Sequence, residues 1–213
     1  MSYYPVMLDI KDKHVTVIGG GQVALRKVQD LCAAGARVRV VAPRVRDEIA
    51  SLEGEAVKIE RRAYREGDLK GAALAFSCTN DAAVNALVFR EAQARGIFLN
   101  AVDDPPNCSF IVPSFSQRGD FLLAVSTSGA SPAMAARLRR MIEAAVPGDI
   151  VTILDALREA RRVVQTDDRF AQLSADGRGE MLKRIVNDDA LLAELAGAFR
   201  AQKLAGFLTK LLG

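Results

Sequence analysis

The chain has few of the residues from which metal centres and disulfide frameworks are built. Its 213 residues include one histidine, three cysteines and no tryptophan, and aromatic residues make up only 6%. The cysteines, Cys32, Cys78 and Cys108, are odd in number and widely spaced. This pattern is typical of free thiols rather than of disulfides or a zinc site. We therefore expect three small, mainly structural cysteines and no resident metal ion.

Long apolar runs and a strong excess of one charge are also lacking. No stretch approaches the ~18 apolar residues that a membrane-spanning helix needs, and residues 1–5 lack a signal-peptide pattern. The net charge is only +3, so the composition gives no reason to expect nucleic acid as a partner. Half of the residues are hydrophobic, which is enough for a substantial core. We expect a compact cytoplasmic protein that binds neither a membrane nor nucleic acid.

The most informative feature that is present is a glycine-rich turn. An apolar run at residues 14–18 leads directly into the sequence GGGQVA at residues 19–24. Gly19 permits a sharp reversal, Gly21 lets the backbone approach a pyrophosphate, and the small Ala24 lets the following helix pack closely on the strand. The free N–H groups at the positive end of that helix would hold the phosphates.

A second strand, predicted at residues 36–41, completes a βαβ unit and favours a dinucleotide site over a glycine turn that binds no nucleotide. An NAD site often has an acid about 20 residues after the glycines to hold the ribose hydroxyls. Here the strand runs instead into Ala42, Pro43 and Arg44. Ribose contacts would fall to the backbone of this segment, and Arg44 would suit a 2′-phosphate equally well. The strand end therefore leaves the choice between NAD and NADP open.

Strands and helices continue to alternate as far as residue 102. Further strands are predicted at residues 57–60, 73–77 and 97–102, with a helix at 81–95. This is the pattern of an α/β fold with a Rossmann-like, doubly wound parallel sheet. Ligands of such sheets bind at the carboxyl ends of the strands. The segments expected to converge there are residues 19–23, 42–44, 77–80 and 103–104.

The alternation ends after Pro105 and Pro106. Two extended runs, residues 109–115 and 121–126, predict a hairpin that turns through residues 117–120, with Pro113 on an edge or kinked strand. A helix at residues 132–145 follows, with Ser131 as its N-cap. From residue 149 onward the apolar spacing is helical throughout, which predicts a small C-terminal helical domain.

Arginines gather in two groups on these predicted helices. The groups are Arg137, Arg139 and Arg140, and Arg158, Arg161 and Arg162. Solvated helix faces are the default interpretation. An anionic ligand is the alternative.

Five motifs occur in a characteristic order: YPVMLDI at residues 4–10, GGGQVALRK at 19–27, NAVDDP at 100–105, SFIVPS at 109–114 and STSGASP at 126–132. Together they resemble the precorrin-2 dehydrogenase family, which includes stand-alone dehydrogenases and the dehydrogenase/ferrochelatase module of siroheme synthase. The resemblance covers essentially the whole chain. It implies a homodimer with an NAD-binding Rossmann domain at residues 1–113, a dimerisation region at 114–148 and a helical domain at 149–213.

The resemblance also implies an activity, the NAD-dependent oxidation of precorrin-2 to sirohydrochlorin in siroheme biosynthesis. The family's catalytic aspartate matches Asp103, which would act as the base for the departing proton. The alternative for Asp103 is an Asx turn, although Asp104 fits that role better. The family's cofactor contacts map onto Gly21, Gln22, Val23, Pro43 and Arg44. Gly19, in the turn itself, and Thr79, at the end of the fourth predicted strand, are further candidates for cofactor contact.

The tetrapyrrole substrate of this family carries several carboxylates, so the resemblance also gives the basic residues a purpose. The residues assigned to substrate binding are Ser126, Thr127, Ser128 and Arg137. Insertion of ferrous ion into sirohydrochlorin, a ferrochelatase activity, stays open, because some members of the family only dehydrogenate. The single histidine, His14, is expected at the far end of the sheet, so this activity would have to rest on Asp103 as the base. A non-catalytic NAD-binding regulatory module is the alternative function.

Overall fold

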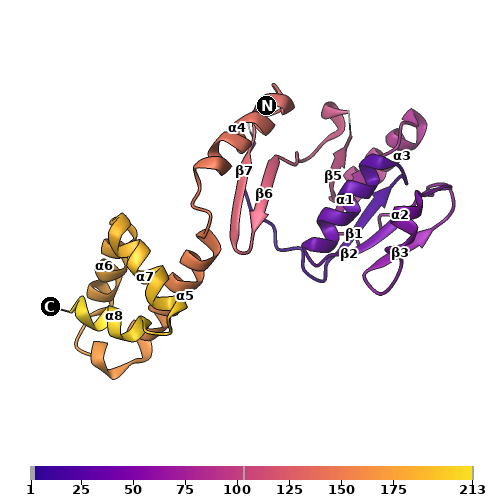
Figure 1. Ribbon diagram of the computed structural model, residues 1–213. Coiled ribbons are helices and arrows are strands. Elements are labelled where there is room, and N and C mark those ends of the chain that lie inside the picture. The colour runs from indigo at the N-terminus through magenta and orange to yellow at the C-terminus, as the bar shows by residue number, and fades with distance from the viewer. Residues whose placement is uncertain (1–2, 103, 213) are drawn as a thin grey trace. The chain divides into compact units, whose positions relative to one another are not determined.

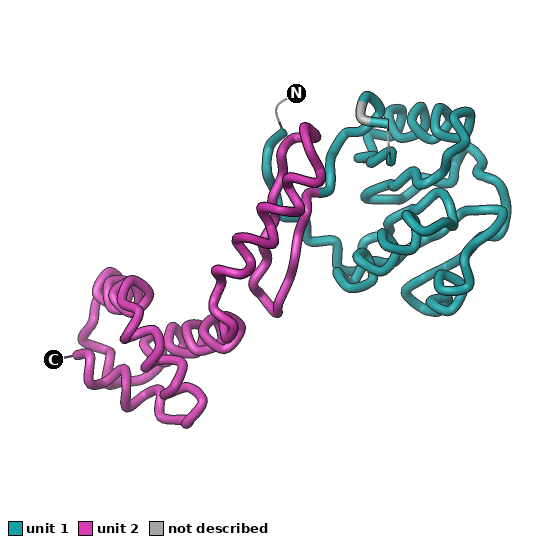
Figure 2. Tube along the Cα trace, turned by 45° about the horizontal axis from the view of Figure 1, so that its top comes forward, with its two compact units in different colours: residues 1–112 teal, residues 113–213 magenta. Residues whose placement is uncertain are grey.

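The computed structural model describes residues 3–102 and 104–212. The chain forms two compact units, Met1–Val112 and Pro113–Gly213 (Figure 2), and each has a hydrophobic core of its own. The three domains predicted at residues 1–113, 114–148 and 149–213 stay a prediction. None of the described helices combines the length and the apolar character needed to cross a bilayer.

The first unit contains a sheet of five parallel strands in the order β3-β2-β1-β4-β5 (Figure 1). The strands are β1 His14–Ile18, β2 Arg37–Val41, β3 Val57–Glu60, β4 Leu74–Ser77 and β5 Phe98–Ala101. The first strand, β1, lies in the centre of the sheet, β2 and β3 follow on one side of it, and β4 and β5 follow on the other. The predicted doubly wound parallel sheet is confirmed.

Helices cover both faces of this sheet. Helix α1, Gln22–Ala33, buries an apolar stripe against one face, where Val15 and Val17 of β1 belong to the same core cluster. Helix α3, Ala82–Arg95, packs on the other face. It starts at the N-cap Asp81 and ends at Gly96, which has φ +66°. A short helix, α2 at Asp47–Ala50, follows β2.

The connection between β3 and β4 has no helix among its described residues, so the expected alternation is interrupted there. Two buried carboxylates anchor this connection instead. Asp68 pairs with Arg39 at 3.2 Å and with Arg62 at 2.6 Å. Glu91 of α3 accepts hydrogen bonds from the N–H groups of Gly67, at 2.9 Å, and of Leu69, at 3.3 Å. Charge-assisted hydrogen bonds thus hold this connection, and Tyr64 and Leu69 add apolar packing against the core.

The second unit starts with a hairpin of β6, Ser114–Arg118, and β7, Phe121–Val125. The predicted first strand at residues 109–115 and the predicted turn at 117–120 are wrong. Ser109 and Phe110 bond back to β5, through Leu99 and Asn100, and are not available to the hairpin. The turn consists of residues 119–120 alone, because glycine at 119 adopts φ +55°, as a two-residue hairpin turn requires.

Helices make up the rest of the second unit. They are α4 Pro132–Ala145, α5 Ile150–Thr166, α6 Ala175–Val186, α7 Asp189–Arg200 and α8 Leu204–Lys210. Helix α4 packs on the hairpin, whereas α5 to α8 surround a core that includes Phe170, Ile185 and Leu195. Ser131 caps α4 as predicted, by accepting a hydrogen bond from the Met134 N–H at 3.2 Å.

Candidate cofactor site and active site

Two loops from elsewhere in the sheet pack closely against the glycine turn after β1. Gly19 has φ +118°, which L side chains rarely adopt, and a Cβ atom there would lie 2.4 Å from the carbonyl oxygen of Cys78. A Cβ atom at Gly20 would lie 2.2 Å from the carbonyl oxygen of Arg44. Both distances are far below van der Waals contact. The loops that follow β2 and β4 therefore meet the glycine turn at the carboxyl ends of the strands.

The third glycine, Gly21, is the N-cap of α1 and has open space where a Cβ atom would stand. In the described part of the chain no side chain caps this helix, and its first turn contains no acid. The first bond within the helix joins the Leu25 N–H to the Gly21 carbonyl at 3.0 Å, so the earlier N–H groups have no partner inside the helix. Gln22 and Val23, which carry two of these groups, are exposed. This arrangement fits a pyrophosphate held by backbone N–H groups.

Pro43 and Arg44 follow β2 and are exposed. Glu60 ends the neighbouring strand β3, but Arg39 holds its carboxylate through Nε at 2.6 Å, and Arg62 pairs with it as well. The strand end therefore presents backbone groups and an exposed guanidinium to a ribose or to its 2′-phosphate. The ribose contacts predicted for Pro43 and Arg44 stay predictions, and the choice between NAD and NADP stays open at this strand end.

The loop after β4 supplies Cys78 and Thr79. Thr79 Oγ1 accepts a hydrogen bond from the Asp81 N–H at 3.2 Å, so the hydroxyl already organises the loop and retains its own proton for another acceptor. Burial raises the pKa of the Cys78 thiol to about 12, so the thiol stays protonated at neutral pH. This agrees with a structural cysteine and not with a nucleophile.

The predicted base, Asp103, lies outside the described residues, and its role stays a prediction. Residues near it in the chain are tied to the sheet. The Val102 N–H donates to the Ser77 carbonyl at 2.9 Å. The Cys108 thiol accepts from the Ala101 N–H at 3.2 Å and donates to the Ala101 carbonyl at 3.0 Å. Val102, the residue before Asp103, is thus joined to the end of β4, and Cys108 is joined to the end of β5.

Asp104 forms the turn that follows. Its Oδ2 accepts from Nδ2 of Asn107 at 2.7 Å, and its carbonyl accepts from the Asn107 N–H at 3.1 Å. These bonds accompany one turn of 3₁₀ helix over Pro105–Asn107. The carboxylate of Asp104 therefore has a structural partner, as expected for the turn-forming member of the pair.

In the second unit, the predicted substrate loop is closed by its own hydroxyl groups. Thr127 Oγ1 accepts from the Ser131 N–H and donates to the Ser131 carbonyl, both at 3.0 Å. Ser126 Oγ accepts from the N–H of Ser128, whose φ is +53°. Ser126 and Ser128 are exposed, whereas Thr127 is half-buried. The substrate contacts expected from these three residues and from Arg137 stay predictions.

The arginines of the two sequence groups differ in whether an acid pairs with them. Arg139 donates to Ser114 Oγ at 3.2 Å and pairs with Glu143, so it holds α4 on the hairpin. Arg158 and Arg162 pair with acids of their own helix, at 2.8 and 2.5 Å. Arg139 thus has a structural role, and Arg158 and Arg162 belong to an ion-paired helix face. The remaining members are exposed: Arg137, Arg140 and Arg161.

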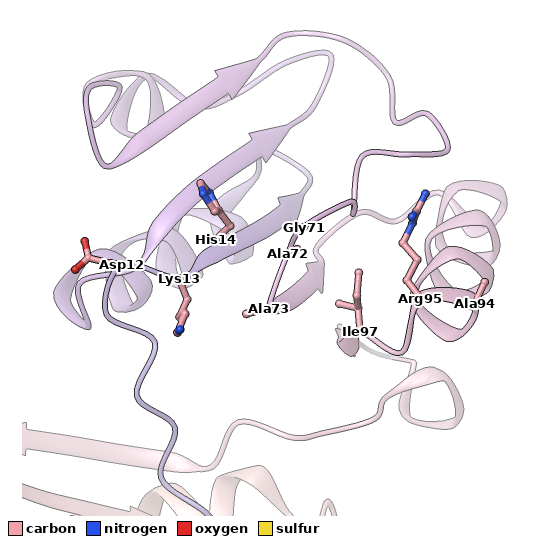
Figure 3. A pocket seen from close by; sticks show the side chains of 9 residues that line it. All are labelled: Asp12, Lys13, His14, Gly71, Ala72, Ala73, Ala94, Arg95 and Ile97. Carbon is pink, nitrogen blue, oxygen red and sulfur yellow. The ribbon is translucent and has the colours of Figure 1, made fainter.

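A pocket of about 620 Å³ lies at the opposite edge of the sheet, where the strands begin (Figure 3). The long side chains of Lys13, His14 and Arg95 line it but point in different directions. Arg95 is also bound through Nε to Glu91, at 2.6 Å. Because these groups do not converge, the pocket is no candidate for the cofactor. His14 lies at this edge, as expected.

Comparison with known proteins places the chain in a family. The family model described as putative NAD(P)-binding matches residues 6–114, and the model described as sirohaem biosynthesis protein central matches residues 122–145. The chain belongs to the precorrin-2 dehydrogenase family. The siroheme synthase of Ectopseudomonas mendocina is 37% identical over 203 residues, which cover 95% of this chain and 42% of that protein. The siroheme synthase of Stutzerimonas stutzeri is 35% identical, with 100% and 46% covered.

A solved structure of SirC, precorrin-2 dehydrogenase, matches this chain with a TM-score of 0.78 and 28% identity, over 99% of both chains. The chain spans less than half the length of the curated siroheme synthases but the whole length of SirC. These matches confirm the predicted fold. They also confirm the predicted class of cofactor, a nicotinamide dinucleotide.

Two further positions shape this site, and neither has a role that the sequence alone predicts. The first is Gly20, whose contact with the Arg44 backbone depends on where the β2 loop folds. The run of three glycines was the available signal, because a dinucleotide fingerprint of this kind accounts only for the first and third. The second is Asn85, which bonds to both Ser77 and Thr79. A polar residue in the first turn of a predicted helix is common, so the sequence does not indicate that Asn85 bonds to another segment.

Proposed function

We propose that this chain oxidises precorrin-2 to sirohydrochlorin with NAD as the hydride acceptor. The observation that carries the proposal is the match to SirC, precorrin-2 dehydrogenase, over 99% of both chains. The cofactor cradle described above supports it. The α1 N-terminus, with Gly19, Gly21, Gln22 and Val23, would hold the pyrophosphate, while Pro43, Arg44 and Thr79 would border the ribose and nicotinamide half.

NAD, when bound, supplies the hydride acceptor. The chain must then orient the tetrapyrrole and receive the proton that leaves as the ring system is oxidised. Asp103 is proposed as the base, because it follows Val102, whose N–H is bonded to the end of β4 beside the cofactor cradle. The exposed groups Ser126, Ser128 and Arg137 are proposed to bind substrate carboxylates. Thr127, whose hydroxyl proton bonds to the Ser131 carbonyl, is proposed to hold the loop in shape for that binding.

A direct assay tests the proposal. Incubation of the purified chain with precorrin-2 and NAD should produce the sirohydrochlorin absorbance and an equal amount of NADH. NAD binding without turnover would instead support the non-catalytic regulatory module. Comparison of kcat/KM for NAD and NADP tests the cofactor: we expect NAD to be preferred, and a clear preference for NADP would show that Arg44 reads a 2′-phosphate.

Ferrous ion is a second substrate that the family leaves open, and no described feature favours it. Adding ferrous or cobaltous ion to the finished reaction, and following the change from sirohydrochlorin to the metallated ring, tests that activity. The cytoplasm is proposed as the location. The three cysteines are free in the structure, as expected in a reducing compartment.

The active form is proposed to be a homodimer. Helix α4 has an exposed apolar stripe with the spacing of one helix face, made up of Met134, Leu138, Met141 and Ile142. The hairpin also exposes Phe115 and Leu122, which lie on the face that does not contact α4. A second copy of the chain would cover this surface, which we call the α4–hairpin surface.

A further inference from the structure

Asn85 makes two side-chain hydrogen bonds that leave its own helix. Its Oδ1 accepts from the Ser77 hydroxyl at 2.6 Å, and its Nδ2 donates to the Thr79 carbonyl at 3.2 Å. The orientation of the amide follows from the second bond, because a carbonyl needs a donor. Asn85 therefore ties the first turn of α3 to the end of β4 and to the loop after it.

These bonds are not needed to start α3. Asp81 already caps that helix by accepting from the N–H groups of Ala83, at 2.9 Å, and Val84, at 3.1 Å. Asparagine is also a poor helix former, since its amide competes for backbone partners. Half-burial of such a residue in a first turn calls for another reason.

Ser77 joins the two halves of the candidate site. The residue is 1% exposed, and its carbonyl accepts from Val102, the residue before Asp103. The next residue, Cys78, donates its N–H to the Ile18 carbonyl at 2.7 Å, and its own carbonyl packs against Gly19. The loop that Asn85 holds thus touches the glycine turn on one side and the Asp103 segment on the other.

We propose that Asn85 is a positioning residue for the dehydrogenation. It acts through Ser77 and Thr79, which fix the relative placement of the pyrophosphate cradle and the segment that carries Asp103, and it contacts neither the cofactor nor the substrate. This inference rests on the proposed function for its catalytic consequence. The effect of Asn85 on NAD binding can be measured without catalytic turnover and does not depend on the proposed function.

The Asn85→Asp variant isolates the bond to Thr79. A carboxylate still accepts from Ser77 but places a negative oxygen against the Thr79 carbonyl. At pH 8 we expect the Kd for NAD, measured by calorimetry without substrate, to rise by about 10-fold. Protonation restores a donor, so the affinity should recover as the pH is lowered toward about 5. Asn85→Ala should show the weaker binding without that recovery, and all other titrating groups are the same in both variants.

Asn187→Asp is the control, because Nδ2 of Asn187 also donates to a carbonyl, that of Lys183 at 2.9 Å, but in the second unit. It should leave the Kd for NAD unchanged at every pH. Ser77→Ala removes a single bond and should raise the Kd by about 3-fold, which provides a milder variant if Asn85→Asp does not fold.

A lower melting temperature with unchanged Kd for NAD and unchanged kcat, in both Ser77→Ala and Asn85→Ala, would overturn the proposal. So would an identical pH dependence of NAD binding in Asn85→Asp and Asn85→Ala. Absence of precorrin-2 turnover in the wild-type chain would contradict the proposed function instead, and the binding measurements would still decide the role of Asn85.

Discussion

At the scale of single residues, three consecutive glycines are required for different reasons. Gly19 and Gly20 are in van der Waals conflict with any side chain because backbone from two other loops lies against them. Gly21 has nothing within 4 Å of the place where a Cβ would stand, so packing does not require a glycine there. Its requirement comes from the ligand, since a methyl group would stand in the space that the pyrophosphate is proposed to enter.

A matched pair of substitutions separates these two causes. Gly20→Ala should destabilise the first unit by about 1–3 kcal/mol, because the Arg44 carbonyl must move. Gly21→Ala should leave the melting temperature near that of the wild type and raise the Kd for NAD by about 10-fold. Thermal unfolding and NAD titration of both variants provide the measurements. A stable Gly20→Ala variant with normal NAD binding would contradict the packing argument.

The two neighbouring aspartates can be separated in the same way. Asp103→Asn removes the proposed base but keeps its shape, so the rate of dehydrogenation should fall by about 10²-fold or more while NAD affinity is retained. Asp104→Asn keeps an oxygen that can accept from Asn107, so it should be well tolerated. Steady-state kinetics with precorrin-2 compares the two. If Asp103→Asn keeps the wild-type rate and Asp104→Asn loses it, the roles of the two aspartates are reversed.

At the scale of elements, the β3–β4 connection depends on two ionised carboxylates. Burial alone would raise the pKa of Asp68, but hydrogen bonds from Arg62 and the Arg65 N–H outweigh it and hold that pKa below its usual value. The pKa of Glu91 is likewise lowered against burial, by Tyr64, the Gly67 N–H and Arg95. A lowered folded-state pKa means that the stabilisation is present above the unfolded-state pKa and is lost as the pH falls through the folded-state value.

We therefore expect the first unit to lose stability as the pH falls below about 4. Glu91→Gln should lower the melting temperature at pH 7, and this difference should shrink as the pH is lowered, because the wild-type carboxylate is then neutralised as well. Glu194→Gln, which changes an exposed residue of α7, is the control and should follow the wild-type profile. A difference between Glu91→Gln and the wild type that is constant from pH 7 to about 3 would contradict the ionic anchoring.

At the scale of the whole molecule, the α4–hairpin surface predicts association between copies of the chain. Met141 is 58% exposed, the largest exposed fraction among the four residues of the apolar stripe. Met141→Glu should convert a dimer to a monomer, seen by sedimentation velocity, without loss of helical circular dichroism, since burial of an unpaired charge opposes association. Arg140→Glu changes a charge on another face of α4 and should leave the dimer intact. A wild-type chain that sediments as a monomer at micromolar concentration would contradict the proposed homodimer.

The sequence predicted features that depend on neighbours along the chain. Strand β3 lies at the predicted residues, α3 lies within the predicted range 81–95, and α4 spans the predicted range 132–145 behind its predicted N-cap Ser131. Hydrophobic periodicity and capping residues act over a few positions, so they can be recognised without knowledge of the fold. The five motifs likewise indicated the family from their order alone.

Tertiary structure decided what depends on residues far apart in the chain. The conflict that excludes a side chain at Gly19 involves Cys78, and the bond that closes the Asp103 segment runs from Val102 to Ser77. The first strand of the hairpin begins later than the extended run, because Ser109 bonds to β5 instead. Such contacts arise only when the strand order of the sheet brings these segments together. Local pattern therefore determined the elements and the family, whereas the packing of loops at the carboxyl ends of the strands determined the shape of the site.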